Sequence, residues 1–266
     1  MMSKFICPVC KSNLTKSEKT YTCINRHSFD ISKDGYVNLL MSQQSSQKRH
    51  GDDKLMVRSR REFLSAGFYE QLRNKIRDVV KDYTRIGATV VDVGCGEGYY
   101  SQSVCDSVAF YGIDISKDAL KFASKSIKNG EFAVASAFNL PFEAQIDCIL
   151  NIFAPSAYED FHRVLKDDGY LIKAVPLENH LWELKCAVYD EPYKNKPEIK
   201  NENLFEMVHF EELVYQIHLT NSEDIANLFR MTPYFYKTSK EATERILQKT
   251  ELLTTVHFGV EVYRKR

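Results

Sequence analysis

Four side chains that can bind a metal lie within the first 27 residues of the chain. Cys7 and Cys10 form a C-x-x-C pair, and Cys23 and His27 follow after twelve residues, with three residues between them. Zinc prefers four thiolate and imidazole ligands in a tetrahedron, and a C-x-x-C turn presents two sulfurs from one stretch of backbone. The spacing therefore predicts one structural zinc ion, because four protein ligands leave no open position for catalysis. So short a lobe should need its metal to fold.

Length and composition suit a small lobe joined to an α/β domain of ordinary size. The chain has 266 residues, of which 44% are hydrophobic, enough for a sizeable core. It has no run of eighteen apolar residues that could span a membrane, and Cys7 follows the start too closely for a signal peptide. Its seven cysteines are an odd number, and four are scattered through apolar segments, unlike a disulfide framework. We therefore expect a reduced, cytoplasmic protein.

The charges are distributed unevenly although the formal net charge is zero. Residues 1–61 carry twelve Lys and Arg against five Asp and Glu, whereas the rest of the chain carries 24 against 31. Such asymmetry is typical of proteins that contact a polyanion, although solvated surface charge would explain it too. The basic stretch Lys48–Arg61, with Arg58, Arg60 and Arg61, is the segment that we expect to contact RNA.

The sequence pattern predicts three parts. Residues 1–40 read as a zinc-binding lobe that ends in an apolar strand or arm, Tyr36–Leu40, which could pack on the next domain. Residues 41–82 read as a polar linker followed by two connecting helices, with a break near Ala66-Gly67. Residues 83–266 should form the second, larger domain.

Strands alternate with helices along this larger domain. The predicted strands are Thr89–Val93, Val108–Ile113, Glu131–Ala135, Ile146–Ile152, Gly169–Val175, Phe205–Leu219 and Leu252–Tyr263. The predicted helices are Tyr99–Cys105, Lys117–Lys128, Tyr158–Leu165, Leu181–Tyr189, Ser222–Arg230 and Lys240–Lys249. This alternation indicates βαβ units and a mostly parallel seven-stranded sheet whose late strands form an antiparallel edge. The fold class is therefore α/β, with a small N-terminal zinc ribbon.

A glycine-rich turn follows the first strand of this domain. Gly94, Gly96 and Gly98 come directly after Asp92, at a point where a helix is predicted to begin. Glycines there let the backbone approach a ligand closely. Asp114, about twenty residues further on, ends the next strand and suits the hydroxyls of a ribose. This distance alone does not separate NAD from S-adenosylmethionine, and the glycines could simply turn a strand into a helix.

Further motifs resemble class I methyltransferases, which are Rossmann-like enzymes that use S-adenosylmethionine. They are the Asp92 that precedes Gly94, the E-G-Y-Y continuation, and F-H-R-V-L-K-D-D-G-Y before the fifth strand. The family usually ends this last motif with Pro-Gly-Gly, whereas this chain has Asp167-Asp168-Gly169. The departure touches a turn and not the cofactor site.

Eight motifs in order resemble bacterial 23S rRNA guanine-N1 methyltransferases over nearly the whole chain. They are C-P-V-C, C-I-N-R-H-S-F-D, K-D-G-Y-V-N-L-L, S-A-G-F-Y, D-V-G-C-G-E-G-Y-Y, L-P-F, N-I-F-A-P and H-L-W-E-L-K. The resemblance implies a homodimer that methylates N1 of a guanine in a hairpin loop of 23S rRNA, near the peptide tunnel where macrolide-type antibiotics bind. It also implies that Tyr69, Gly98, Tyr99 and His180 contact the cofactor.

Several of these residues have ordinary explanations as well. Tyr69 would more often be helix packing, whereas His180 lies beyond the fifth strand, where open α/β sheets bind ligands. Asn151 and Phe153 end the fourth strand in a motif that loosely resembles the N/D-P-P-Y motif of amino-methyltransferases. We expect the Asn151 amide to bond a base edge and Phe153 to stack on it, although a plain strand-end turn explains the motif equally well. No carboxylate declares itself as the base that deprotonates N1.

Three interpretations of function compete at this level. The first is an rRNA methyltransferase with 23S rRNA as its partner. The second is a small-molecule class I methyltransferase with an incidental zinc lobe, against which the basic N-terminal part argues. The third is a zinc-dependent RNA-binding protein without catalysis, against which the intact glycines and Asp114 argue.

Overall fold

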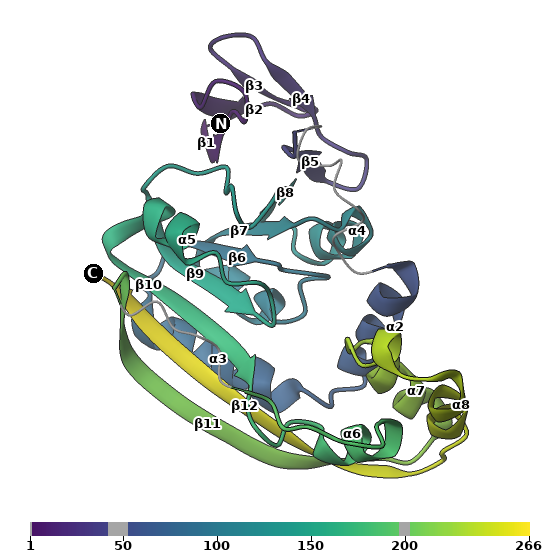
Figure 1. The fold of residues 1–266 in the computed structure, drawn as a ribbon. Helices are drawn as coiled ribbons and strands as arrows, with labels where there is room; N and C mark the ends of the chain where they lie inside the picture. The colour runs from purple at the N-terminus through teal and green to yellow at the C-terminus, as the bar shows by residue number, and fades with distance from the viewer. Residues whose placement is uncertain (1, 42–52, 197–202) are drawn as a thin grey trace.

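The computed structural model describes residues 2–41, 53–196 and 203–266, and its strands form two sheets (Figure 1). The smaller sheet belongs to the N-terminal lobe and is antiparallel in chain order. Its strands are β1 (Met2–Ile6), β2 (Asn13–Lys16), β3 (Thr20–Cys23) and β4 (Ser28–Asp30). Two hairpin turns, between β1 and β2 and between β3 and β4, carry the four predicted metal ligands.

The larger sheet has eight strands in the order β11-β12-β10-β9-β6-β7-β8-β5. Their bounds are β5 (Tyr36–Asn38), β6 (Thr89–Val93), β7 (Ala109–Asp114), β8 (Glu131–Val134), β9 (Ile146–Ile152), β10 (Leu165–Pro176), β11 (Phe205–Leu219) and β12 (Leu252–Lys265). The strands from β5 to β10 pair in parallel, and β12 pairs antiparallel with both β10 and β11. The mostly parallel sheet and its antiparallel edge are confirmed. Seven strands are the predicted ones, and the lobe contributes the eighth.

Buried apolar runs explain the central strands. All five residues of β6 are buried, as expected for a parallel strand that is covered on both faces.

The α-helices are α2 (Lys54–Ser65), α3 (Glu70–Tyr83), α4 (Lys117–Ser126), α5 (Tyr158–Val164), α6 (Trp182–Val188), α7 (Ser222–Arg230) and α8 (Lys240–Leu247). The break between α2 and α3 falls at Ala66-Gly67, which confirms the prediction of two connecting helices.

The predicted helix Tyr99–Cys105 is wrong. The chain instead forms two short 3-10 segments, Ser101–Ser103 and Cys105–Ser107. Serine hydroxyls compete with the backbone for its hydrogen bonds here: Ser103 Oγ donates to the carbonyl of Tyr100 at 2.7 Å. Side chains of this kind disfavour a regular helix.

The lobe is docked on the larger sheet and shares its core. β5 pairs in parallel with β8, so the predicted apolar arm is an edge strand of the larger sheet. The amide of Ile6 donates to the carbonyl of Pro141 at 2.9 Å. The ring of Phe5 lies 5.2 Å from that of Tyr111 and 5.3 Å from that of Phe142. The predicted boundary at residue 40 therefore separates parts that pack as one body.

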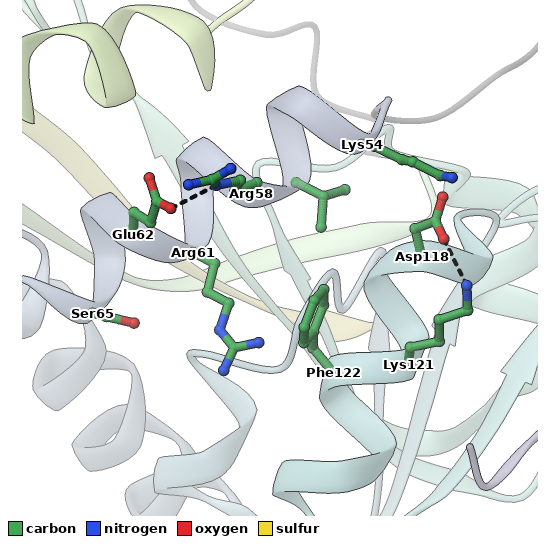
Figure 2. A pocket seen from close by; sticks show the side chains of 9 residues that line it. Lys54, Arg58, Arg61, Glu62, Ser65, Asp118, Lys121 and Phe122 are labelled. Carbon is green, nitrogen blue, oxygen red and sulfur yellow. Dashed lines mark hydrogen bonds and ion pairs between the residues drawn. The ribbon is translucent and has the colours of Figure 1, made fainter. Parts of the chain in front are cut away.

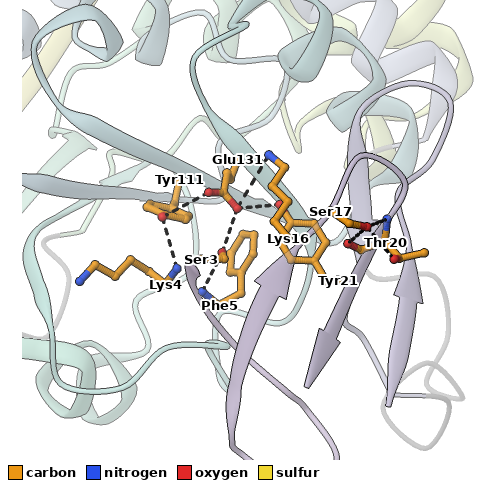
Figure 3. A network of polar contacts seen from close by, with 9 residues as sticks. All are labelled: Ser3, Lys4, Phe5, Lys16, Ser17, Thr20, Tyr21, Tyr111 and Glu131. Carbon is orange, nitrogen blue, oxygen red and sulfur yellow. Dashed lines mark hydrogen bonds and ion pairs between the residues drawn. The ribbon is translucent and has the colours of Figure 1, made fainter. Parts of the chain in front are cut away.

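Polar contacts converge on Glu131, the first residue of β8 (Figure 3). Its Oε2 accepts hydrogen bonds from Ser3 Oγ at 2.8 Å and from the Tyr21 hydroxyl at 2.6 Å. Its Oε1 lies 3.4 Å from the Tyr111 hydroxyl, and Lys16 Nζ lies 4.0 Å from the carboxylate. One carboxylate of the larger sheet thus contacts three strands of the lobe, β1, β2 and β3.

The strand order reverses between β6 and β9. From β6 the chain builds β7 and β8 on one side, then crosses over to build β9 and β10 on the other. Open α/β sheets bind ligands at such a point, outside the carboxyl ends of the strands. Helix α2 contacts both α4 and α7, and so spans from one part of the larger domain to another beside this edge (Figure 1). None of the described helices is long and apolar enough to cross a membrane.

Candidate metal centre and cofactor site

The four predicted metal ligands converge in the lobe. The Sγ atoms of Cys7, Cys10 and Cys23 and a ring nitrogen of His27 all lie within 4.8 Å of one another. The Sγ atoms of Cys10 and Cys23 are 3.7 Å apart, and Nδ1 of His27 lies 3.3 Å from Cys23 Sγ and 3.5 Å from Cys7 Sγ. The cysteines are free thiols, not disulfides.

These separations fit a tetrahedral zinc ion. Zinc–sulfur bonds of about 2.3 Å and zinc–nitrogen bonds of about 2.0 Å give tetrahedron edges of roughly 3.8 Å between sulfurs and 3.5 Å between sulfur and nitrogen. Three thiolates and one imidazole complete the coordination, so the ion that they suit is structural. Two ligands come from the turn after β1 and two from β3 and the turn that follows it, so the metal would join the two hairpins in addition to the pairing of β2 with β3.

The glycine loop places its backbone against the end of β7. The amide of Gly94 donates to the carbonyl of Ile113 at 2.7 Å, and the amide of Gly96 donates to Oδ2 of Asp114 at 2.8 Å. Gly94 has φ +80°, and a Cβ there would lie 2.5 Å from the Cβ of Ala154. Gly96 has φ +54°, but a Cβ there would meet no atom within 4 Å. The loop is therefore packed behind Gly94 and open in front of Gly96, as a ligand cradle requires. Gly98 faces α4, since a Cβ there would lie 3.3 Å from the Cβ of Ala123.

Asp114 is held at the rim of this cradle. Its two carboxylate oxygens accept one backbone hydrogen bond each, from Gly96 and, at 2.7 Å, from Ser116. Burial raises the pKa of Asp114, and the bonds from Ser116 and Gly96 oppose that rise. Each oxygen keeps a further lone pair, so this fixed carboxylate can still accept hydrogen bonds from the hydroxyls of a ribose.

Two further carboxylates beside the loop have unpaired oxygens. Oδ1 of Asp92 and Oε2 of Glu97 are buried and have no hydrogen-bond partner in the described part of the chain. The other oxygen of Asp92 accepts a short hydrogen bond from the Ser101 hydroxyl. Burial raises the pKa of each carboxyl group to about 7. Buried acceptors without donors suit a ligand that brings an ammonium group, as the amino-acid end of S-adenosylmethionine does. The residues present thus fit that cofactor, and Glu97 was not singled out from the sequence.

Arg60 turns inward toward this site, unlike the exposed Arg58 and Arg61 on the same helix. It is partly buried, and its guanidinium donates to the carbonyl of Met231 at 3.3 Å. Burial lowers the pKa of Arg60, while the charges of Asp114, Tyr100 and Glu97 oppose that fall. The expected contact between Arg60 and RNA therefore does not fit its position, because it lies beside the cofactor carboxylates. The helical phase of α2 decides this, and the R-S-R-R sequence alone did not reveal it.

Aromatic rings from separate elements meet next to the switch point. The ring of Tyr69, the residue before α3, lies 5.0 Å from that of Phe258 on β12 and 6.2 Å from that of His180. The ring of Phe258 also lies 4.5 Å from His180 and 5.1 Å from Phe153. Tyr69 and His180, predicted as cofactor contacts, are thus brought together in one aromatic wall. The hydroxyl of Tyr69 is buried and has no hydrogen-bond partner among the described residues.

Tyr99 lies behind the glycine loop rather than in the aromatic wall. Its ring is 5.0 Å from that of Tyr100, and the guanidinium of Arg73 lies 4.9 Å above it. Tyr100 in turn lies 6.1 Å from Phe153. Tyr99, predicted as a cofactor contact with Gly98, is therefore connected to Phe153 only by way of Tyr100 among these ring contacts.

His180 is a neutral hydrogen-bonding group at this site. Burial lowers its pKa to about 3, with the charges of Lys185 and His257 adding to the effect. Its Nδ1 lies 3.3 Å from the backbone amide of His257, which donates to it. A neutral ring that accepts at Nδ1 carries its proton on Nε2, so His180 offers a donor on its other side.

The two catalytic candidates differ in position. Asn151 is 1% exposed, and its amide bonds the carbonyl of Pro155 at 3.2 Å and the hydroxyl of Ser156 at 3.2 Å. Its side chain therefore fixes the turn after β9. Phe153, in contrast, is 44% exposed and has φ +54°. A bulky residue in left-handed conformation is strained, and such strain is concentrated at functional sites.

Two family models match the two parts of the chain. The model described as "RlmA, N-terminal" matches residues 5–48, which include all four metal-binding side chains. The model described as "Methyltransferase domain" matches residues 85–250, which include the glycine loop and Asp114. Together they assign the lobe as a zinc ribbon and the larger domain as a methyltransferase.

Two relatives that match about 70% of the chain are named as 23S rRNA guanine-N1 methyltransferases. The protein named "Putative 23S rRNA (guanine-N(1)-)-methyltransferase YxjB" of Bacillus subtilis is 37% identical over 201 residues, covering 71% of this chain and 70% of that protein. The "23S rRNA (guanine(748)-N(1))-methyltransferase" of Streptomyces fradiae is 32% identical over 189 residues, covering 68% and 66%. The crystal structure of the YcgJ protein of Bacillus subtilis has a TM-score of 0.51 at 16% identity, covers 74% of this chain and 99% of that one, and shows the fold alone. The chain belongs to the family of 23S rRNA (guanine-N1)-methyltransferases.

Proposed function

We propose that the protein transfers the methyl group of S-adenosylmethionine to N1 of a guanine in a hairpin loop of 23S rRNA. The observation that carries this proposal is the joining, in one body, of a ribbon-type metal lobe to a glycine loop with Asp114 at its rim. The lobe matches the family of rRNA enzymes, and the names of the relatives state the same reaction. The excess of Lys and Arg in residues 1–61 favours a polyanionic substrate over a small molecule.

The residues around the loop would hold and orient the cofactor. S-adenosylmethionine, when bound, supplies a methyl group on a sulfonium, which guanine N1 can displace directly. Asp114 would accept hydrogen bonds from ribose hydroxyls, and the unpaired oxygens of Asp92 and Glu97 would accept them from an ammonium group. Much of the rate enhancement then comes from positioning, because the donor is already reactive.

The target base must leave its stack to reach this site, because N1 lies on the Watson–Crick edge of guanine. Phe153 is the exposed ring at the carboxyl end of β9, and we assign it the stacking contact with the extruded guanine. Asn151 positions Phe153 by fixing the turn that follows β9. The aromatic wall of Tyr69, His180 and Phe258 would exclude water from one side of the reacting atoms.

Two further properties belong to the same proposal. An rRNA substrate puts the reaction in the cytoplasm. A homodimer is supported by the edge strand β11, whose Val208, Phe210 and Val214 are 38%, 46% and 56% exposed. Exposed apolar side chains on an edge strand suit a second protein surface. Analytical ultracentrifugation with a Phe210→Glu variant would test this assignment.

The decisive experiment is methylation of protein-free 23S rRNA by the purified protein with labelled S-adenosylmethionine. A methyl group on N1 blocks Watson–Crick pairing, so reverse transcriptase should stop one nucleotide before the modified guanine. We expect one stop, which is absent when the cofactor is omitted. Incorporation only into small molecules, or no incorporation with correctly folded protein, would overturn the proposal.

A further inference from the structure

A cavity of about 580 Å³ lies between helices α2 and α4 (Figure 2). This volume falls within the range of about 300–1,000 Å³ that is usual for ligand sites. The cavity adjoins the glycine loop, since Arg61 on its wall lowers the pKa of Glu97, which burial raises. It is nevertheless separate from the aromatic wall, because none of the rings of that wall lines it.

The walls of this cavity are mostly basic. Lys54, Arg58 and Arg61 come from α2 and Lys121 from α4, against two carboxylates. Arg58 pairs with Glu62 at 2.8 Å, and Lys121 pairs with Asp118 at 2.8 Å, both within one helix and partly exposed. Exposed pairs of this kind contribute little stability, so their cations can turn to a phosphate at small cost. Within the described part of the chain, no carboxylate pairs with Lys54 or Arg61.

Arg61 and Phe122 pack against each other on the wall of the cavity (Figure 2). The guanidinium carbon of Arg61 lies 4.3 Å from the centroid of the Phe122 ring. A guanidinium plane and an aromatic ring are both surfaces on which nucleic acid bases stack. The cavity therefore combines the two chemistries that recognise an unstacked nucleotide, a flat face for the base and cations for its phosphates.

Basic side chains continue from the cavity to the zinc lobe. Lys125, one turn after Lys121 on α4, pairs with Asp34 of the lobe at 2.8 Å. Lys125, Lys33 and Lys121 together lower the pKa of Asp34, so all three lie close to that carboxylate. A single strand that contacts the lobe could thus follow these cations to the edge of the cofactor site.

We propose that the α2–α4 cavity holds an unstacked nucleotide of the RNA substrate, near the guanine that is methylated. Its base extends the stack that Arg61 and Phe122 already form, and the adjoining phosphates contact Lys54 and Lys121. This inference rests on the proposed function and adds to it the surface that guides the RNA from the lobe to the cofactor.

Affinity for an rRNA hairpin fragment, measured by fluorescence anisotropy at several salt concentrations, tests the inference. Phe122→Leu keeps the apolar bulk and removes the ring, so affinity should fall roughly fivefold to a hundredfold with an unchanged salt slope. Arg61→Lys keeps the charge and removes the plane, so it should act in the same direction. Lys121→Gln should lower the salt slope by about 0.7–0.9, the contribution of one phosphate contact. Lys81→Gln with Lys249→Gln, both exposed and outside the cavity, is the matched control.

Calorimetry with S-adenosylmethionine measures the affinity of the cofactor site in every variant. We expect unchanged cofactor affinity in Phe122→Leu. RNA affinity equal to that of the parent protein, or a loss of cofactor affinity instead, would overturn the inference. Methylation of 23S rRNA by the parent protein, measured in the same experiment, separates the two proposals. If the parent protein methylates and Phe122→Leu keeps full RNA affinity, only the cavity assignment is refuted. A parent that does not methylate refutes both.

Discussion

The hydroxyl of Tyr21 in the zinc lobe donates a 2.6 Å hydrogen bond to Oε2 of Glu131 in the larger sheet. Burial and the neighbouring carboxylate raise the pKa of Tyr21, so the phenol remains a donor at neutral pH. Ser3 donates to the same oxygen at 2.8 Å. The lobe is thus fixed to the core by polar contacts as well as by the pairing of β5 with β8.

Glu131→Ala should therefore destabilise the whole protein. The variant leaves the Tyr21 and Ser3 hydroxyls without their acceptor, which we expect to cost roughly 2–4 kcal/mol. Urea denaturation of the zinc-loaded protein measures this loss. Glu143→Ala, at an exposed residue of the following loop, is the control and should change stability little. Equal stability of the two variants would mean that the Glu131 contacts contribute nothing to docking.

Loss of the metal should weaken both parts of the chain. Cys10→Ser removes one thiolate, and a lobe that is folded by its metal should then loosen. Because β5 belongs to the larger sheet, we expect the melting temperature of the whole protein to fall by roughly 5 °C or more. RNA affinity should fall more than cofactor affinity, which is measured in parallel by calorimetry. Cys186→Ser, at an exposed free cysteine, is the control. An unchanged melting curve for Cys10→Ser would contradict a structural zinc.

Asp114→Ala should weaken cofactor binding while the fold persists. The carboxylate is the proposed acceptor for ribose hydroxyls, and hydrogen bonds to a charged group contribute roughly 1.5–3 kcal/mol, or about tenfold and upward in affinity. Calorimetric titration with S-adenosylmethionine measures the change. Asp106→Ala, exposed and remote from the glycine loop, should bind like the parent protein. A dissociation constant unchanged by Asp114→Ala would remove this residue from the site.

Asp92→Asn should stabilise the cofactor-free protein at high pH. Burial raises the pKa of Asp92 to about 7, so the folded state holds its proton more tightly than the unfolded chain does. Stability from this group is therefore greatest at low pH and falls as pH rises from about 4 to about 7. The asparagine has no charge to bury and can still accept from Ser101, so at pH 8 we expect a gain of roughly 1–4 kcal/mol.

That gain should shrink toward pH 4, and cofactor affinity should fall at every pH. Chemical denaturation of both proteins at pH 4.5 and pH 8 measures the first effect. Ser101→Ala is a useful comparison, because it removes the hydrogen bond to Asp92 and keeps the charge. A gain for Asp92→Asn that is equal at both pH values would contradict a buried carboxylate with a raised pKa.

Local patterns in the sequence were enough to predict most elements. β6 and β9 are short, mostly apolar segments rich in Val and Ile, and their predicted bounds, Thr89–Val93 and Ile146–Ile152, are those observed. The metal ligands could be predicted because their spacing is set by two short turns. The segment Tyr99–Cys105 was predicted wrongly because its serine hydroxyls, and not apolar periodicity, decide its conformation.

Features that depend on distant contacts could not be predicted in the same way. Tyr36–Leu40 indicated an apolar arm, but its pairing with β8 joins segments almost a hundred residues apart. Arg60 and Arg61 are neighbours in sequence, yet one lies beside Asp114 and the other over Phe122. The packing of α2 against its neighbours decides which arginine faces the cofactor carboxylates and which faces the cavity. That packing cannot be predicted from the sequence of α2 alone.

Phe153 offers a test that separates strain from function. Its φ of +54° is unfavourable for a bulky side chain, so Phe153→Gly should be more stable than Phe153→Ala by roughly 1 kcal/mol, since glycine tolerates this conformation. Both variants lose the ring that we assign to the extruded guanine, and both should methylate rRNA more slowly. Base stacking contributes roughly 1–3 kcal/mol, so the expected loss in kcat/KM is about fivefold to a hundredfold.

The control for Phe153 is Leu253→Ala, at an apolar residue of similar exposure on β12, 49% against 44%. It should leave the rate of methylation by a given amount of folded enzyme close to that of the parent. Cofactor affinity should be unchanged in Phe153→Ala, because the ring is assigned to the base and not to the cofactor. If Phe153→Gly is both more stable than Phe153→Ala and as active as the parent, the strained ring has no part in catalysis, and the turn after β9 is only a connection between β9 and α5.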